Sequence, residues 1–196
     1  MSDLETAVQP QLSGIIRDGA SMYFTPRDVT KLAAFTFKNA IIANCVNPER
    51  EPFFTRAARE QFRAKRQIPP DVHMWIAALS AATATCAFWG YVISSHETPN
   101  NSLWHDLEIY VFTFAIGYLV LQLRAFRYGN LLNRGRKVPV ALTQSEFWDD
   151  FAIQFWPAEG TFSWPPKKYL SDWFAPAADS LAGFARRWEG PIRLEK

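Results

Sequence analysis

The sequence predicts an α+β fold in which N-terminal helices and a C-terminal helix pack on a mostly antiparallel sheet. Two segments in the first 70 residues combine helix start signals with apolar residues at helical spacing. Two long uncharged stretches, rich in β-branched and aromatic residues, follow them. With 196 residues, of which 48% are hydrophobic, the chain suits one compact domain. We divide it into a helical part (1–71), a sheet region (72–166) and a C-terminal helix and tail (167–196).

Start signals define the first helices. Residues 1–24 predict a short helix that leads into a turn at Gly19. Thr25 is a favourable N-cap, Pro26 suits the first helical position, and Asp28 places negative charge in the first turn. The amphipathic helix that begins there is predicted to end near residue 45.

The next helix is predicted from its N-cap Thr55 to about Gln67, because Pro69 cannot continue a helix. Four of its arginines recur at a spacing of three to four residues, so they lie close to one helical face. Glu60 is the only acid within this helix, and the face should attract phosphate or an acidic partner. A solvated helical face is the plainer interpretation. The candidate contact residues are Arg56, Arg59, Arg63 and Arg66.

Residues 74–95 and 109–123 contain no charged side chain. Buried strands are near-continuous apolar runs, and each stretch divides into two short runs, near residues 80–84 and near Gly117. Alternatively, the two stretches form a membrane hairpin, because the first is long enough to cross about 30 Å of hydrocarbon. Basic residues flank the pair and acids occupy its loop, which would place both termini in the cytoplasm. We favour the sheet, and the hairpin stays open as the alternative.

A second basic cluster follows these stretches, in residues 124–137, where no acid occurs. Phe126 and Tyr128 interleave with its arginines, and charge combined with aromatic rings is typical of surfaces that bind single-stranded nucleic acid. An ordinary basic loop is the plainer interpretation. The candidate contact residues of this cluster are Arg124, Arg127, Arg134, Arg136 and Lys137.

The C-terminal part predicts one strand and one helix. The run FAIQFWP predicts a strand that ends at Pro157, and a proline-rich turn, SWPPKK, follows. An apolar stripe with the spacing i, i+3, i+4 and i+7 then predicts a final helix. The stripe consists of Leu181, Phe184, Ala185 and Trp188.

The remaining reactive residues form no recognisable catalytic or cofactor motif, so we expect no cofactor. Cys45 and Cys86 lie among apolar residues, and we expect buried free thiols. His96 and His105 bracket a polar loop with two carboxylates, which makes them candidates for a metal or acid–base site, although a solvated turn is the plainer interpretation. His73 is expected to be a structural histidine at the start of a strand.

The N-terminus has no basic segment followed by an apolar one, so we expect no signal peptide. The expected location is therefore the cytoplasm. The membrane hairpin would instead place the chain in the inner membrane, and a membrane is not excluded as a partner.

A series of motifs spans residues 8–188: a Thr-Pro-x-Asp helix start, an Arg-rich helix, a Pro-Pro-x-x-x-x-Trp-Ile strand start, a Thr-x-x-x-Gly-x-Leu-x-x-Gln strand and two Trp-Pro pairs. Their positions are Phe24, Thr25, Pro26, Asp28, Phe37, Lys38, Pro69, Pro70, Trp75, Ile76, Thr113, Gly117, Leu119, Gln122, Trp156, Pro157, Trp164 and Pro165. This pattern resembles the region that follows the nuclease domain in bacterial HNH-type endonuclease-like proteins.

The resemblance implies an accessory region, because the histidines and zinc-binding cysteines of such nucleases have no counterpart in this sequence. It also favours the sheet over the membrane hairpin. We therefore expect a non-catalytic accessory or binding module in a nuclease-associated system, of a defence or mobile-element kind. Its expected partner is nucleic acid, or a separate nuclease or other protein subunit.

Overall fold

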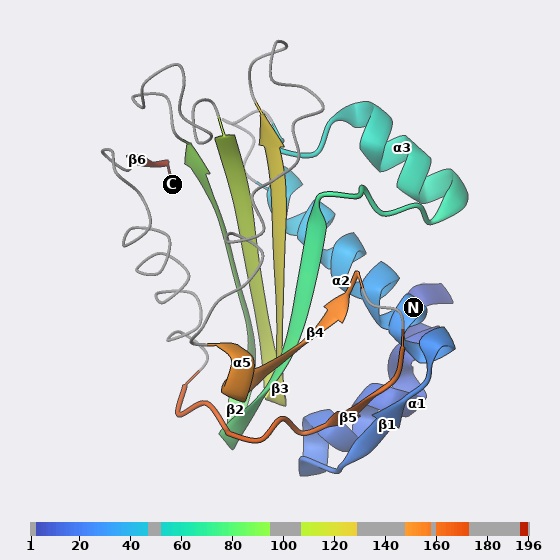
Figure 1. The fold of residues 1–196 in the computed structure, drawn as a ribbon, viewed down its shortest axis with the longest axis vertical. Helices are drawn as coiled ribbons and strands as arrows, with labels where there is room; N and C mark the ends of the chain where they lie inside the picture. The colour runs from blue at the N-terminus through green and yellow to red at the C-terminus, as the bar shows by residue number, and fades with distance from the viewer. Residues whose placement is uncertain are drawn as a thin grey trace.

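The computed structural model describes residues 3–46, 52–94, 107–128, 148–157, 160–172 and 193–195. In these ranges the chain is an α+β protein in which helices cover one face of an antiparallel sheet (Figure 1). The predicted fold class is therefore confirmed. The C-terminal helix predicted around residues 181–188 lies outside the described residues.

The three N-terminal helices form where the sequence predicts them: α1 spans Asp3–Asp18, α2 spans Pro26–Cys45 and α3 spans Arg56–Lys65. A four-residue helix, α5 (Trp148–Phe151), precedes the strand β4. Helix α2 begins with a complete capping box, because the Thr25 hydroxyl accepts a bond from the Asp28 amide and the Asp28 carboxylate accepts one from the Thr25 amide. Helix α3 has its predicted N-cap, Thr55, and ends two residues before the predicted limit.

The main sheet contains β2 (Val72–Ser94), β3 (Leu107–Tyr128), β4 (Ala152–Trp156) and β6 (Arg193–Glu195). Its order is β3-β2-β4, and β6 also pairs with β2; all of these pairings are antiparallel. A smaller sheet joins β1 (Met22–Phe24) to β5 (Phe162–Trp164). The strand β4 was predicted, whereas β1, β5 and β6 were not.

Strand β3 doubles back at Gly117, where the backbone has a φ of +57°. The amide of Gln122 donates to the hydroxyl of Thr113 at 3.2 Å, although nine residues separate them. A straight strand would hold these residues about 30 Å apart, at roughly 3.3 Å per residue. Strand β2 follows the same bend, since its register with β3 shifts twice between Ala78 and Ala87. Both break points that the sequence predicts thus coincide with irregularities in the sheet.

The hydrophobic core lies between the helices and one face of this sheet. Met74 and Ile76 of β2 and Leu121 of β3 meet the apolar faces of α1 and α2, with Phe37 of α2 fully buried. Because side chains alternate along a strand, the intervening residues project to the opposite face, where Trp75 packs in a second cluster. In Figure 1, α2 passes behind the sheet and α3 lies beside its upper end.

Two sequence predictions are resolved by this architecture. The uncharged stretches are strands, so they do not form the two-helix hairpin; among the described helices, none has the length and apolarity needed to cross a bilayer. The expectation of buried thiols was wrong, because Cys45 and Cys86 are both exposed. Cys45 is the last residue of α2, and Cys86 lies where β2 departs from regular register.

Candidate partner-binding groove

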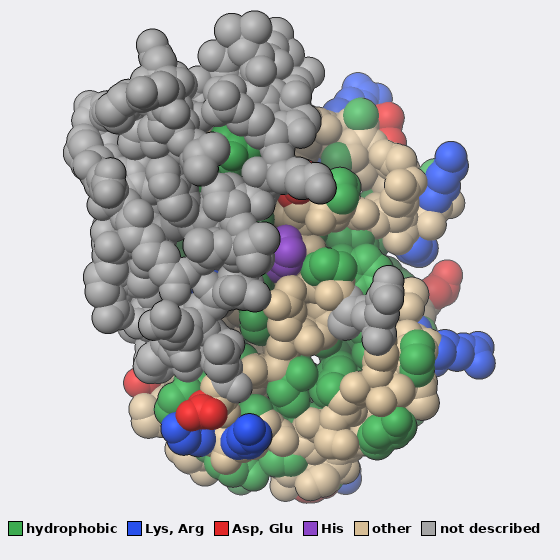
Figure 2. All heavy atoms as spheres, viewed as in Figure 1, with side chains coloured by type: hydrophobic (Ala, Val, Ile, Leu, Met, Phe, Trp, Pro, Cys, Tyr) green, Lys and Arg blue, Asp and Glu red, His purple; other side chains and the backbone are tan. Residues whose placement is uncertain are grey.

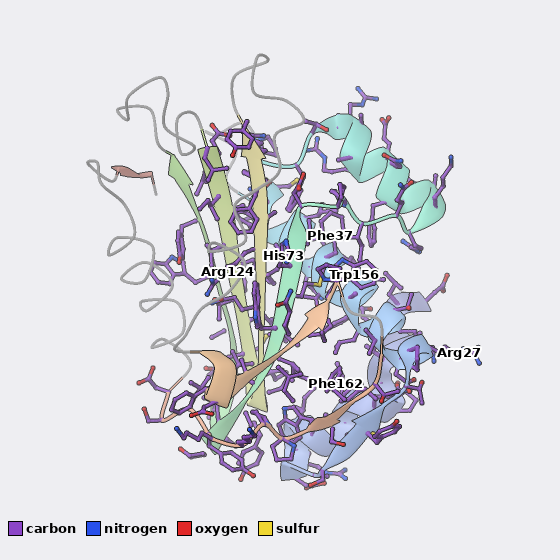
Figure 3. The ribbon with its side chains drawn as sticks, viewed as in Figure 1. Arg27, Phe37, His73, Arg124, Trp156 and Phe162 are labelled. Atoms are coloured by element: carbon purple, nitrogen blue, oxygen red, sulfur yellow. The ribbon has the colours of Figure 1, made fainter. Side chains whose placement is uncertain are left out.

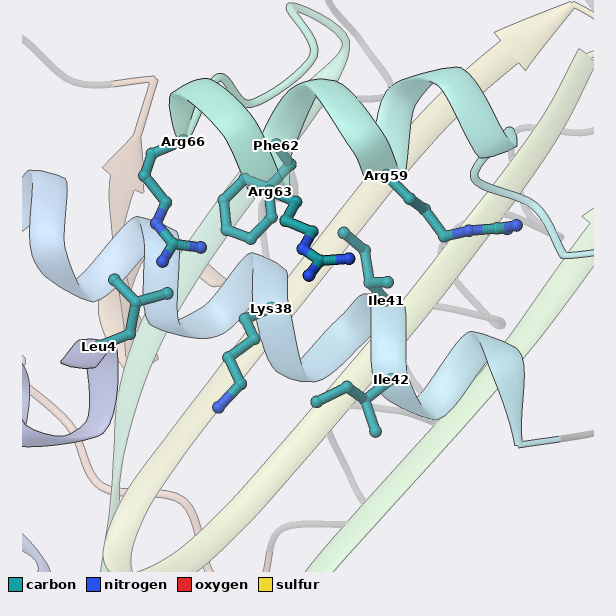
Figure 4. Close-up of a pocket in the computed structure, with 8 residues that line it drawn as sticks. All are labelled: Leu4, Lys38, Ile41, Ile42, Arg59, Phe62, Arg63 and Arg66. Atoms are coloured by element: carbon teal, nitrogen blue, oxygen red, sulfur yellow. The ribbon is translucent and has the colours of Figure 1, made fainter. Parts of the chain in front are cut away.

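A groove of about 240 Å³ lies between α3 and α2, with the start of α1 at one end (Figure 4). Its apolar lining comes from all three helices, and its polar lining is entirely cationic. The apolar residues are Leu4, Ile41, Ile42 and Phe62, and the cationic residues are Lys38, Arg59, Arg63 and Arg66. We call these eight residues the basic groove.

Helix α3 presents its arginines to the groove because Phe62 fixes its rotation. The Phe62 ring is buried and packs edge-on against Phe37 of α2, with ring centroids 4.9 Å apart. Residues three and four apart lie on one helical face, so Arg59, Arg63 and Arg66 flank this anchor. Figure 4 shows the side chains of Arg63 and Arg66 reaching toward α2, whereas that of Arg59 runs along α3. Three of the four arginines predicted to share one face of this helix therefore line the groove, and the fourth, Arg56, does not.

The arginines of the basic groove differ in how firmly they are held. A guanidinium nitrogen of Arg59 donates to the carbonyl of Phe54 at 2.6 Å, and the Arg66 guanidinium lies 5.6 Å from the centre of the Phe62 ring. Arg63 is exposed. In the described ranges no ion pair joins any of these three arginines to a carboxylate. Their charge is therefore left for an external anion.

Two further cations of this region are paired within the chain. Lys38 donates to the Glu5 carboxylate at 2.6 Å, which ties α2 to α1. Arg56 pairs with Glu60 at 2.8 Å, and neither residue lines the groove. In Figure 2, Lys and Arg side chains project along the margin where α3 lies. Lys38 was not among the predicted contact residues, because its sequence position marks only the polar side of α2.

Two arginines of the second basic cluster, Arg124 and Arg127, lie on opposite faces of the sheet. Arg124 is only 7% exposed; its guanidinium lies 4.8 Å from the Trp75 ring centre and donates to Gln122 at 3.0 Å. Arg127 lies on the helix-covered side, where it pairs with Glu108, donates to the Phe53 carbonyl and covers the Phe53 ring. Both side chains therefore hold the fold together.

The other members of that cluster, Arg134, Arg136 and Lys137, lie outside the described residues, as do His96 and His105. Within the described ranges, no group of three or more His, Cys, Asp or Glu side chains has a geometry that would hold a metal ion.

His73 has the structural environment that the sequence predicts. It lies beside Arg124 in the register of β2 and β3 (Figure 3), and its ring packs 5.8 Å from that of Phe126. The Gln154 amide nitrogen, which also donates to the Trp156 carbonyl, lies 3.2 Å from Nδ1 of His73. Since an amide nitrogen only donates, Nδ1 accepts. Burial, followed by the charge of Arg124, lowers the pKa of His73, so the ring is neutral at pH 7.

Comparisons with protein-family models, with curated proteins and with solved structures gave no match to this chain. The likeness to the region downstream of HNH nucleases thus stays an expectation from the motifs.

Proposed function

We propose that this chain is a non-catalytic binding module that recognises an anionic macromolecule at the basic groove. One observation supports this proposal above the others: three arginines, free of described carboxylate partners, flank an open groove. Guanidinium groups bind carboxylates and phosphates through paired hydrogen bonds, and their charge persists at any physiological pH.

Nucleic acid and an acidic protein are the two partner classes that such a surface suits. Nucleic acid is favoured by the density of charge on α3, which carries Arg56, Arg59, Arg63, Lys65 and one acid, Glu60. A protein partner is favoured by the apolar side chains that line the groove, because contacts to phosphate groups do not require an apolar surface. A role beside a separate nuclease subunit is part of the proposal only through the sequence resemblance.

The test is a charge reversal at one groove residue with a matched control on the same helix. Arg63→Glu changes the groove, whereas Lys65→Glu makes the same change of charge at an exposed residue that does not line it. Arg59 is less suitable, because its bond to Phe54 supports the fold. The ligands are a labelled single-stranded oligonucleotide and labelled poly-glutamate, with binding measured by fluorescence anisotropy at low and at physiological salt.

We expect at least one ligand to bind the wild-type chain, with affinity that falls as salt rises. Arg63→Glu should weaken this binding by about tenfold or more, and Lys65→Glu by less than about threefold, because charged contacts weaken with distance. Equal losses in the two variants would indicate diffuse attraction without a site. If the wild-type chain binds neither ligand, the proposal is wrong.

A further inference from the structure

A second groove, of about 210 Å³, adjoins the basic groove at the C-terminal end of α2. Four of its residues come from α2 and the residue after it, and four come from β2 and β3. They are Asn39, Ile42, Ala43, Val46, Cys86, Phe88, Phe112 and Phe114. We call these eight residues the apolar groove, since its only polar side chains are one amide and one thiol.

Large apolar side chains are unusually exposed in the apolar groove. Ile42 is 50% exposed, Val46 63% and Phe88 57%. In the described part of the chain only two other large hydrophobic residues, Tyr23 and Tyr169, reach similar values, and neither lines the groove. Clustered apolar exposure of this kind marks a surface that another molecule covers, whereas single exposed residues need no explanation.

The sheet explains why these side chains stay uncovered. Phe88 pairs with Phe114 in the register of β2 and β3, so both project to the face on which α2 packs. Helix α2 ends at Cys45, and Val46 follows as its C-cap. The Phe88 side chain therefore lies beside the end of the helix, where it is 57% exposed.

The two grooves adjoin one another, because Ile42 lines both of them. The combined surface has exposed apolar side chains at one end and the arginines of α3 at the other. No Asp or Glu is among the described residues that line either groove. The complementary molecule therefore carries an apolar stripe beside negative charge.

We propose that the occupant is an acidic amphipathic segment of a partner protein, whose apolar side chains enter the apolar groove while its carboxylates meet Arg59, Arg63 and Arg66. This inference rests on the proposed function and specifies the class of anion. A helical segment places apolar residues at i, i+3, i+4 and i+7 on one face and acids beside them, which is the usual way in which helices bind grooves. Besides Phe88, the strongly exposed apolar side chains of the groove are the aliphatic Ile42 and Val46, which suit the aliphatic side chains of such a segment.

The experiment compares two peptides of about 15 residues and identical leucine and glutamate content. One has its leucines at helical spacing, and in the other their order is shuffled so that no stripe exists. Binding is measured by fluorescence anisotropy to the wild-type chain and to three variants: Phe88→Ser, the matched control Tyr23→Ser, and Arg63→Glu. Tyr23 is 58% exposed, close to the 57% of Phe88, but lines neither groove. Circular dichroism checks the fold, and Val46→Ser replaces Phe88→Ser if that variant does not fold.

We expect the striped peptide to bind about tenfold more tightly than the shuffled one, because one large apolar side chain contributes on that scale. Phe88→Ser and Arg63→Glu should each reduce its affinity by about tenfold, and Tyr23→Ser should leave it unchanged. If both peptides bind equally and Arg63→Glu weakens both, the proposed function stands and the inference about the apolar groove is wrong.

Three other results would also overturn the inference. Binding of a single-stranded oligonucleotide without binding of the striped peptide would identify nucleic acid as the partner. Sedimentation of the chain alone as a dimer, which Phe88→Ser converts to a monomer, would identify a second copy as the occupant. Finally, if no anionic ligand binds, the proposed function and the inference both fail.

Discussion

Replacing Gly117 with alanine tests the bend of β3, which places the sheet against α1. The residue has a φ of +57°, and a Cβ atom there would lie 1.8 Å from the carbonyl oxygen of Ile16. The left-handed backbone conformation is less favourable by about 1–2 kcal/mol for a residue that has a Cβ atom. Forcing α1 away from the bend adds about 1–3 kcal/mol, the usual cost of overpacking. We therefore expect Gly117→Ala to lower the free energy of unfolding by about 2–5 kcal/mol, the sum of these two costs.

Urea unfolding followed by tryptophan fluorescence measures this loss. With a slope of about 2 kcal/mol per molar urea, the midpoint should fall by about 1–2.5 M. Gly160→Ala is the matched control, because a Cβ at that position meets no atom within 4 Å; its free energy should stay within about 0.5 kcal/mol of wild type. If Gly117→Ala unfolds at the same midpoint as this control, α1 does not press on the bend as described.

Two predictions concern pH. The hydrogen bond from the Thr25 hydroxyl is the largest cause that lowers the pKa of Asp28. The Asp28 carboxylate therefore stabilises the fold when the pH is above 3.8, the ordinary pKa of the group. This contribution is lost as the pH falls through the lowered pKa. Asp28→Ala should lower the free energy of unfolding by about 1 kcal/mol at pH 7. Urea denaturation at several pH values should show the difference in this free energy between variant and wild type shrinking in acid, and a difference independent of pH would contradict the reasoning. The pKa of His73 is lower in the folded chain than its ordinary value of 6.5. As pH falls through 6.5, the His73 side chain therefore takes up a proton in the unfolded chain before it does so in the folded chain, and this favours unfolding. Wild type should therefore lose more free energy of unfolding than His73→Gln between pH 7.5 and 5.5, and parallel losses would show that His73 does not titrate in this way.

Local signals were sufficient for much of the fold. The N-cap Thr25, the capping carboxylate of Asp28 and the N-cap Thr55 act within one helical turn, so the sequence displays them directly. Gly117 was also recognisable, because a lone glycine in an apolar run indicates a bend. The short strands β1 and β5 were not recognisable, since each has three residues and forms only by pairing with a distant partner.

The candidate site could be predicted only in part. Helical spacing placed Arg59, Arg63 and Arg66 on one face, and the structure keeps them together. Spacing could not show that Lys38 of α2 lies beneath them, because that depends on how two helices pack. It also could not separate Arg63, which is exposed, from Arg124, which is buried against Trp75.

The α+β class, the limits of the described helices to within a few residues and the cationic face of α3 follow from local signals in the sequence. The pairing of the uncharged stretches as strands, the exposure of Cys86 and the apolar groove beside the arginines emerge only in the folded chain. The difference lies in the range of the interactions. Caps and periodicity act over a few residues, whereas burial and pairing depend on which distant segment covers each side chain. Ile42 illustrates this: its helical position was predictable, but its place between two grooves depends on α3, β2 and β3 together.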